Sequence, residues 1–380
     1  LRKGAELFYC IHEILRYVYD KGNLFCPDFF VIRKKCDNFG TEIFTNTAMK
    51  KLAIGIDIGG INTAFGLIDE NGDMYGESVI STKKFPYYDL YPAYINELCE
   101  GIKLLLRGID FEYELVGIGI GAPLADHYKG ILDNPSNLFK WREGEDASQQ
   151  RILHIVDDVK KQFGGLPVYL TNDANAAAIG EMIYGGAKGM KDFIVVTLGT
   201  GLGGGVVSNG ELVYGHDSFA GELGHVTVDK NGRLCGCGRR GCLETYVSAT
   251  GIRRTVSILL GERNEPSELR DIPFNQLDAL MITQAAERGD SIALAAYEYT
   301  GKILGEALAD FVTFASPEAI FLFGGLSRAG KYIFEPAKKY MEESMLFIYS
   351  NKVKLLPSSI DNKNAAILGA SALVWHSINK

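Results

Sequence analysis

Two stretches of the chain share the order strand, glycine-rich turn, strand, and this repeat most narrows the folds that the sequence can adopt. The first runs from Leu52 through "GIDIGGINTAFGLID", and the second covers 193–208 and contains "TLGTGLGGGVV". Apolar runs bounded by glycine turns predict buried strands. Because glycine lets backbone N–H groups approach an anion, each turn is also a candidate phosphate cradle. The repeat predicts two similar halves, each opening on a glycine-rich hairpin.

Between and after the hairpins, helices and strands are expected to alternate, as they do in an α/β sheet protein. The expected helices are 91–107, 151–163, 291–314 and 364–375, and the further expected strands are 115–120, 167–171 and 319–323. Glycine accounts for 44 of the 380 residues, which is about 12% against a usual ~7%. Backbone turns beside a ligand are one reason for such an excess.

Charge and hydropathy exclude several classes of protein. The net charge of −8 gives the chain no general attraction for nucleic acid or for an anionic membrane. No apolar run approaches the ~18 residues of a membrane-spanning helix, and the first residues lack the order of a signal peptide. We therefore expect a cytoplasmic protein with neither a nucleic acid nor a membrane as partner.

Residues 1–48 carry no motif and differ in character from the rest of the chain. Met49 then opens "MKKLAIGIDIGG", which is typical of the beginning of a domain. We expect an N-terminal extension of unknown role before it. The extension has a nearly balanced charge and no pair of helices around a glycine turn, which argues against a helix-turn-helix domain that binds DNA.

A carboxylate precedes the first glycine turn, because Asp57 ends the strand just before Gly59 and Gly60. Mg²⁺ prefers one or two carboxylates together with substrate phosphates, so Asp57 is a candidate magnesium ligand. The alternative is a plain hairpin turn. In the second turn, glycines match the spacing G-x-G-x-x-G of a dinucleotide site, but the chain continues as a strand rather than the required helix. A phosphate-binding hairpin is the better interpretation.

Asn172 and Asp173 follow a buried strand and open an alanine-rich helix. One hypothesis makes Asp173 the N-cap of that helix. The other makes it a general base, which accepts the proton of a hydroxyl group as that group attacks a γ-phosphoryl group. The two roles are compatible, because a cap needs only one carboxylate oxygen.

A compact cluster of metal-ligating residues follows, with the spacing H-x9-C-x-C-x4-C from His225 to Cys242. Three thiolates and one imidazole match a closed structural zinc site. Glu222 precedes His225 by three residues and Glu244 follows Cys242 by two, so a loop folded around zinc would bring both carboxylates together. Such a group of acceptors suits a polyhydroxylated ligand.

Five motifs in this order closely resemble the ROK family of sugar kinases and repressors, from Met49 to the C-terminus. They are "DIGGINTAFGLID", "PSNLFKW", "TNDANAAAIGE", "VTLGTGLGGGVVSNGELVYGHDSFAGELGH" and "CGCGRRGCLE". The resemblance implies an α/β, actin-like ATPase (ribonuclease H-like) fold with two lobes and a central cleft. The N-terminal lobe would comprise 49–171 and 365–380, and the C-terminal lobe 172–364 with the zinc-binding loop.

The resemblance also implies an ATP-dependent hexose kinase, with glucose as the preferred substrate, ATP and Mg²⁺ as cofactors, a structural Zn²⁺ and a homodimeric state. Asp173 would be the catalytic base. The hexose ligands would be Asn137, Asn172, Glu222, His225 and Glu244, with Asn134 a weaker candidate. ATP and magnesium would lie against Asp57, Gly59, Gly60, Asn62, Thr200, Gly201, Gly324 and Gly325, and zinc against His225, Cys235, Cys237 and Cys242.

One position departs from the family pattern, and alternatives remain open. The family usually has threonine after the double glycine, where this chain has Ile61, so a hydroxyl contact to phosphate is missing. The alternatives are a sugar-responsive transcriptional repressor, a sugar-binding protein without catalysis, and a kinase for mannose, fructose or an N-acetylated hexosamine.

Overall fold

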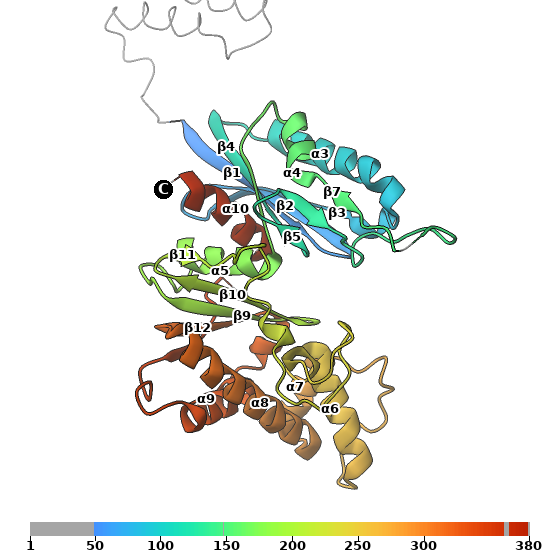
Figure 1. The fold of residues 1–380 in the computed structure, drawn as a ribbon, viewed down its shortest axis with the longest axis vertical. Coiled ribbons are helices and arrows are strands. Elements are labelled where there is room, and N and C mark those ends of the chain that lie inside the picture. The colour runs from blue at the N-terminus through green and yellow to red at the C-terminus, as the bar shows by residue number, and fades with distance from the viewer. Residues whose placement is uncertain (1–48, 147, 361–364, 379–380) are drawn as a thin grey trace, which may run out of the picture. The chain divides into compact units, whose positions relative to one another are not determined.

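A computed structural model describes residues 49–146, 148–360 and 365–378. The extension expected at 1–48 lies outside the described residues. Residues 51–380 form one compact unit, whose main features are two five-stranded sheets (Figure 1). Within the described ranges, no helix combines the length and the apolar character needed to cross a membrane.

The first sheet has the order β3-β2-β1-β4-β8. Its strands are β1 (Lys50–Ile58), β2 (Asn62–Ile68), β3 (Met74–Ser81), β4 (Tyr113–Gly121) and β8 (Val168–Thr171). β1 pairs antiparallel with β2, and β2 with β3, whereas β4 and β8 are parallel. The first glycine hairpin of the sequence is therefore the β1–β2 pair.

The second sheet repeats this plan with the order β11-β10-β9-β12-β13. Its strands are β9 (Phe193–Leu198), β10 (Leu202–Ser208), β11 (Glu211–Leu212), β12 (Ala319–Phe323) and β13 (Lys354–Pro357). β9 and β10 form the antiparallel hairpin, and β12 lies parallel to both β9 and β13. The repeat of hairpin and parallel strands that the sequence predicted is confirmed.

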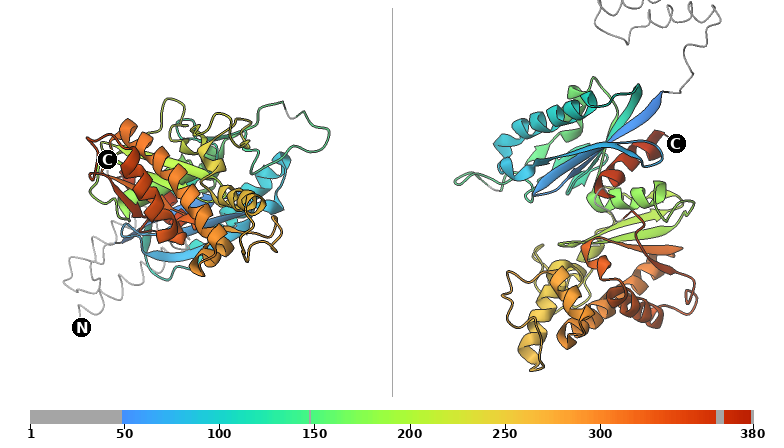
Figure 2. Two further views of the ribbon diagram at one scale, coloured as in Figure 1. Left: turned by 90° about the horizontal axis from the view of Figure 1, so that it is seen from below. Right: turned by 180° about the vertical axis from the view of Figure 1, so that it is seen from behind.

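Helices cover the outer face of each sheet, as the three views in Figures 1 and 2 show. On the first sheet these are α3 (Tyr91–Arg107) and α4 (Ile155–Gln162), and on the second α6 (Ala249–Glu262), α7 (Ala279–Glu287), α8 (Ser291–Ala315) and α9 (Lys331–Ser344). A small sheet joins β5 (Ala125–Asp126), β6 (Ile131–Asp133) and β7 (Ile152–Leu153). Single helical turns are η1 (Thr82–Lys84), η2 (Tyr88–Leu90), η3 (Leu223–His225), η4 (Leu243–Thr245) and η5 (Gly325–Ala329).

The helix expected at 151–163 was wrong at its beginning, because α4 starts only at Ile155. Ile152 and Leu153 instead form strand β7, in which Leu153 pairs with Leu132 and Ile152 with Asp133. Pairing with a strand distant in sequence overrides the local helical preference here. The expected helices 91–107 and 291–314 agree with α3 and α8.

Two helices, α5 (Asp173–Ile183) and α10 (Ala365–Ile378), lie between the two sheets (Figure 1). They pack on each other, while α10 contacts β4 and α5 contacts β10. Ten of the residues of α10 are buried, as expected of a helix with protein on all sides. The contact is close because glycines face it: a Cβ at Gly119 would come 1.9 Å from the carbonyl oxygen of Ala370, and one at Gly55 2.1 Å from that of Ile367.

We expect Gly119→Ala to destabilise the protein, because the added methyl group must push α10 away from β4. Overpacking of this kind costs about 1–3 kcal/mol in the free energy of unfolding, which urea denaturation measures. Gly261→Ala is the matched control, since Gly261 lies on α6 with nothing within 4 Å of its added Cβ. That change should leave stability equal or raise it by up to ~1 kcal/mol. Equal stability of both variants would contradict the close contact.

Candidate active site

A cavity of about 860 Å³ opens between the first sheet, the second sheet and the start of α5. Its size lies within the usual range for small-molecule sites, about 300–1,000 Å³. Residues from ten separate stretches of the sequence, from Asp57 to Ala366, line it. Of the residues singled out in the sequence, those in the wall are Asp57, Asn137, Asn172, Asp173, Thr200, Gly201, Glu222, His225, Cys237, Glu244 and Gly324.

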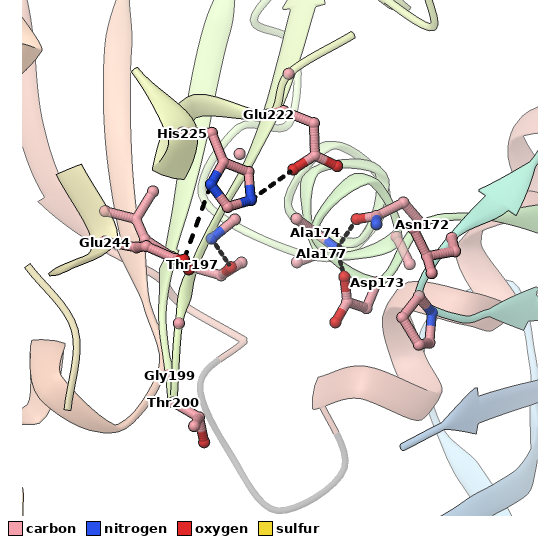
Figure 3. A pocket seen from close by; sticks show the side chains of 18 of the residues that line it. Asn172, Asp173, Ala174, Ala177, Thr197, Gly199, Thr200, Glu222, His225 and Glu244 are labelled. Carbon is pink, nitrogen blue, oxygen red and sulfur yellow. Dashed lines mark hydrogen bonds and ion pairs between the residues drawn. The ribbon is translucent and has the colours of Figure 1, made fainter. Parts of the chain in front are cut away.

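Asn172 and Asp173 stand at the N-terminus of α5, on the opposite side of the cavity from His225 (Figure 3). The N-cap is Asn172, whose Oδ1 accepts a hydrogen bond of 2.9 Å from the backbone N–H of Ala174. The hypothesis that Asp173 is the N-cap was therefore wrong, because the non-helical residue at the helix start is Asn172. Asp173 is the first helical residue, and its Oδ1 accepts from the same N–H at 2.8 Å. Its other carboxylate oxygen is free of this role.

The electrostatics of the cavity favour the protonated form of two carboxyl groups. Desolvation by the surrounding protein raises the pKa of Asp173, although its side chain is exposed to the cavity. Desolvation and the nearby charge of Asp173 raise the pKa of Asp57 to about 6. Two acidic groups therefore face one space, and an ionised pair there would favour a cation beside it.

His225 links two carboxylates through its two ring nitrogens (Figure 3). Its Nε2 lies 4.0 Å from Glu222 Oε2, and its Nδ1 lies 3.8 Å from Glu244 Oε1. η3 carries His225 and begins directly after Glu222, while η4 carries Glu244. The loop thus brings together the two carboxylates that the sequence placed on either side of the cysteine cluster.

The four residues of the cysteine cluster converge, with one ligand atom from each lying within 4.8 Å of all the others. Cys237 Sγ lies 3.7 Å from Cys242 Sγ, and Cys235 Sγ lies 3.8 Å from His225 Nδ1. Ligands bound tetrahedrally to zinc at about 2.0–2.3 Å are separated from one another by roughly 3.4–3.8 Å. The donor set and its spacing therefore fit a zinc ion.

A model of the ROK family matches residues 53–377. The chain belongs to this family. The architecture of two repeated sheets around a cavity is the actin-like ATPase fold that the resemblance implied.

Relatives within the family include both kinases and repressors. The chain is 32% identical over 324 residues to a glucokinase from Halalkalibacterium halodurans, and the match covers 84% of this chain and 94% of that protein. A solved ROK family glucokinase from Streptomyces griseus, in complex with glucose and AMPPNP, is 29% identical with a TM-score of 0.66, covering 85% of this chain and 98% of that one. A xylose repressor from Bacillus spizizenii is 31% identical over 263 residues, but the match covers 69% of this chain and 62% of the repressor.

Of the glycine turns predicted from the sequence, the β9–β10 turn and the turn after β12 contribute residues to the cavity wall, whereas the glycines of the β1–β2 turn do not. Thr200 and Gly201 line it from the β9–β10 turn, and Gly324 lines it from the end of β12. Gly324 has φ of +100°, and a Cβ there would lie 2.9 Å from the carbonyl oxygen of Leu198, so the position requires glycine. Helix α6 supports the β9–β10 turn, because Thr250 Oγ1 donates to the carbonyl oxygen of Thr200 at 3.0 Å.

Some residues predicted for the ROK site do not line the cavity. They are Gly59, Gly60, Asn62, Asn134, Gly325 and two of the proposed zinc ligands, Cys235 and Cys242. A Cβ at Gly60 would lie 2.9 Å from the carbonyl oxygen of Asn137, so this glycine brings the β1–β2 turn against the Asn137 segment. Ile61, which replaces the usual threonine, is 58% exposed on the same turn.

Several residues of the cavity wall were not predicted as site residues from the sequence, among them Leu124, Ser136, Thr197, Ser218 and Phe219. Ser218 is the most informative, because it is buried and has φ of +72°. Its neighbourhood in the sequence, "GHDSFAGE", belongs to a recognised motif, but no local pattern marks the serine. Its partner, Asp126, lies 92 residues away.

The raised pKa of Asp57 predicts that its carboxyl group costs stability at neutral pH. The folded protein binds the proton of the Asp57 carboxyl group more tightly than the unfolded chain does, and this difference stabilises the folded state. The stabilisation is fully present below pH 3.8 and is lost as the pH rises through about 6. Asn imitates the neutral carboxyl group, so the melting temperature of Asp57→Asn should exceed that of the wild type by a margin that grows from pH 4 to pH 7 and then levels off. Calorimetry without ATP or Mg²⁺ measures this margin.

Asp89→Asn serves as a control with the opposite sign, because hydrogen bonds from Arg142 lower the pKa of Asp89. This variant should be no more stable than the wild type at neutral pH. A constant margin for Asp57→Asn between pH 4 and pH 7 would contradict the raised pKa.

Proposed function

We propose that this chain transfers the γ-phosphoryl group of ATP to a hexose, and that glucose is its preferred substrate. The observation that carries the proposal is the position of Asp173, whose carboxylate opens into a cavity shared by the carboxylate–histidine group of η3 and η4 and by the β9–β10 turn. The glucokinases that match most of this chain support the same activity. The cavity volume leaves room for a sugar beside a triphosphate.

In the proposed reaction, Asp173 accepts the proton of the sugar 6-hydroxyl group. The hydroxyl oxygen forms a bond to the γ-phosphorus, the bond from that phosphorus to the β–γ bridging oxygen breaks, and ADP leaves. Desolvation raises the pKa of Asp173, which makes it a stronger base than an ordinary aspartate. Helix α5 holds the carboxylate at its first residue, so the base does not depend on a loop for its position.

The remaining roles follow the positions of the wall residues. Asn137, Asn172, Glu222, His225 and Glu244 would bind the sugar hydroxyl groups, and Thr200, Gly201 and Gly324 would contact ATP. Asp57 would hold Mg²⁺, which supplies positive charge to the phosphates and relieves the repulsion between the two carboxylates. The backbone of the β1–β2 turn would serve in place of the threonine hydroxyl that Ile61 lacks.

Zinc would bind to His225, Cys235, Cys237 and Cys242. It would stabilise the conformation of the loop and would take no part in the reaction. Bound through Nδ1, His225 carries its proton on Nε2 and can donate a hydrogen bond toward Glu222 or a sugar hydroxyl. This arrangement accounts for both roles assigned to His225. The homodimer and the cytoplasmic location remain predictions from the sequence.

The extent of the sequence matches favours a kinase over a repressor. The match to the Halalkalibacterium halodurans glucokinase covers 94% of that protein, whereas the match to the Bacillus spizizenii xylose repressor covers 62% of the repressor. ATP turnover measured with glucose separates the candidates. A repressor or a binding protein would bind the sugar without forming ADP. Turnover compared across glucose, mannose, fructose and N-acetylated hexosamines ranks the possible substrates.

We expect Asp173→Asn to lower kcat by at least about 10²-fold, the lower end of the contribution of a positioned base. Sugar binding should persist, because the proposed hexose ligands are unchanged, and isothermal calorimetry with glucose measures it. The melting temperature should not fall, since Asn172 rather than Asp173 caps α5.

Asp157→Asn is the matched control, because Asp157 is an acidic residue in the first turn of a helix, α4, and does not line the cavity. Its kcat should equal that of the wild type. A folded Asp173→Asn protein with more than about a tenth of wild-type kcat would refute the general-base role.

We expect the purified protein to contain one zinc ion per chain, and Cys242→Ser to lose it. Elemental mass spectrometry gives the metal content directly. A chelator should lower the melting temperature of the wild type and of Cys99→Ala, but not that of Cys242→Ser. Cys99→Ala is the control, because Cys99 is a buried free cysteine on α3 outside the cluster. Equal zinc contents in the wild type and Cys242→Ser would refute the assigned ligand set.

A further inference from the structure

A buried carboxylate joins the turn 126–129 to the loop that precedes Glu222. Asp126 is 3% exposed, and its Oδ1 accepts hydrogen bonds from the backbone N–H groups of Tyr128 and Lys129, both at 3.1 Å. The same oxygen accepts from Ser218 Oγ at 3.0 Å, across 92 residues of sequence. Oδ2 pairs with Lys129 Nζ at 2.8 Å. Three of these bonds are local to one turn, and the fourth reaches the loop that precedes Glu222.

That fourth bond holds a residue in an unfavourable conformation. The loop 214–221 contains three residues of positive φ, Gly215 at 73°, Ser218 at 72° and Gly221 at 91°, and only Ser218 has a side chain. Non-glycine residues adopt such angles at a cost in energy, so surrounding contacts must hold them there. Ser218 is 3% exposed, and its hydroxyl group faces Asp126.

Two further contacts join the same segments. Tyr128 Oη donates to the carbonyl oxygen of Gly215 at 2.9 Å. The ring of His127 stacks on Tyr214, with centroids 3.8 Å apart and planes 8° apart, and His127 Nδ1 lies 2.8 Å from the carbonyl oxygen of Leu170. The backbone N–H of Tyr128 also donates to Ser218 Oγ at 3.4 Å. The turn 126–129 therefore contacts the loop 214–218 at four points.

The loop 214–218 continues directly into the cavity wall. Residues 218–222 all line the cavity, and the last of them, Glu222, faces His225. Only three residues separate Ser218 from Glu222, and one of them, Gly221, packs closely on β10: a Cβ there would lie 2.8 Å from the carbonyl oxygen of Gly204. No residue of the turn 126–129 lines the cavity.

We propose that Asp126 is a positioning residue, which fixes the loop 214–222 through Ser218 and so sets Glu222 for hexose binding. The proposal rests on the hexose kinase function proposed above for its kinetic consequence. The link between Asp126 and the loop stands on geometry alone. It assigns a part in hexose binding to Asp126, which does not line the cavity and acts through Ser218, which does.

Three variants test the link. Asp126→Ala removes every bond to the carboxylate. Ser218→Gly removes the hydroxymethyl side chain and suits the positive φ. Lys129→Met removes the ion pair but leaves the Ser218 bond. We expect the first two to raise the KM for glucose about 10-fold or more, the size of one charge-assisted hydrogen bond. The KM for ATP and kcat should stay within about twofold, and Lys129→Met should behave as the wild type.

Hydrogen exchange of the free protein gives a readout that does not need activity. Amides of 214–222 should exchange faster in Asp126→Ala and Ser218→Gly than in the wild type and Lys129→Met. If the wild type does not phosphorylate glucose, the proposed function fails while this exchange test still decides the link.

Three results would overturn the proposal: unchanged exchange in the loop, an unchanged KM for glucose in an active enzyme, or a parallel rise in both KM values that tracks a lower melting temperature. The last would mean that Asp126 only stabilises the fold. If Asp126→Ala does not fold, Ser218→Gly alone decides, because glycine keeps the backbone conformation of this position.

Discussion

The layer formed by α5 and α10 between the two sheets is the constraint on which the rest of the molecule depends. α10 approaches β1 and β4 so closely that Gly55 and Gly119 leave no room for a side chain. Because α5 packs on α10 and on β10, its N-terminus has a fixed position relative to both sheets. Asp173, the first residue of α5, thereby enters the cavity from a rigid element, and positioned groups gain most from such support.

The burial and the like charges of Asp57 and Asp173 make the cavity suited to a cation together with an anionic substrate. Asp57, near the end of β1, and Asp173, the first residue of α5, face the same space, and the pKa of each is raised. This arrangement costs stability in the empty protein, as charged groups do when they are desolvated without a partner. Such a cost is common where a site awaits a ligand that neutralises it.

Local patterns in the sequence predicted the parts of the fold whose determinants lie close together. The hairpins, α3 and α8 follow from apolar periodicity and glycine turns, and the cysteine cluster spans only His225 to Cys242. Two predictions failed for opposite reasons. β7 forms through pairing with β6, which no local pattern reveals, whereas the cap of α5 falls on Asn172 rather than Asp173 through a difference of one residue in backbone conformation. The Asp126–Ser218 contact lay beyond any local pattern, because it joins residues 92 positions apart.

Two different sets of contacts support the side of the cavity that we propose to bind the sugar. On one side, a metal held by the cysteine cluster would fix His225 through Nδ1, leaving Nε2 to face Glu222. On the other side, the turn at Asp126 holds the loop that leads to Glu222. Glu222 thus takes its position from both ends of a short segment, and loss of either support leaves the other to hold only one end. The side chain of Glu222 is half-exposed. Its position is nevertheless fixed more precisely than this exposure would suggest, because the residues on either side of it in the chain are each held by contacts of their own.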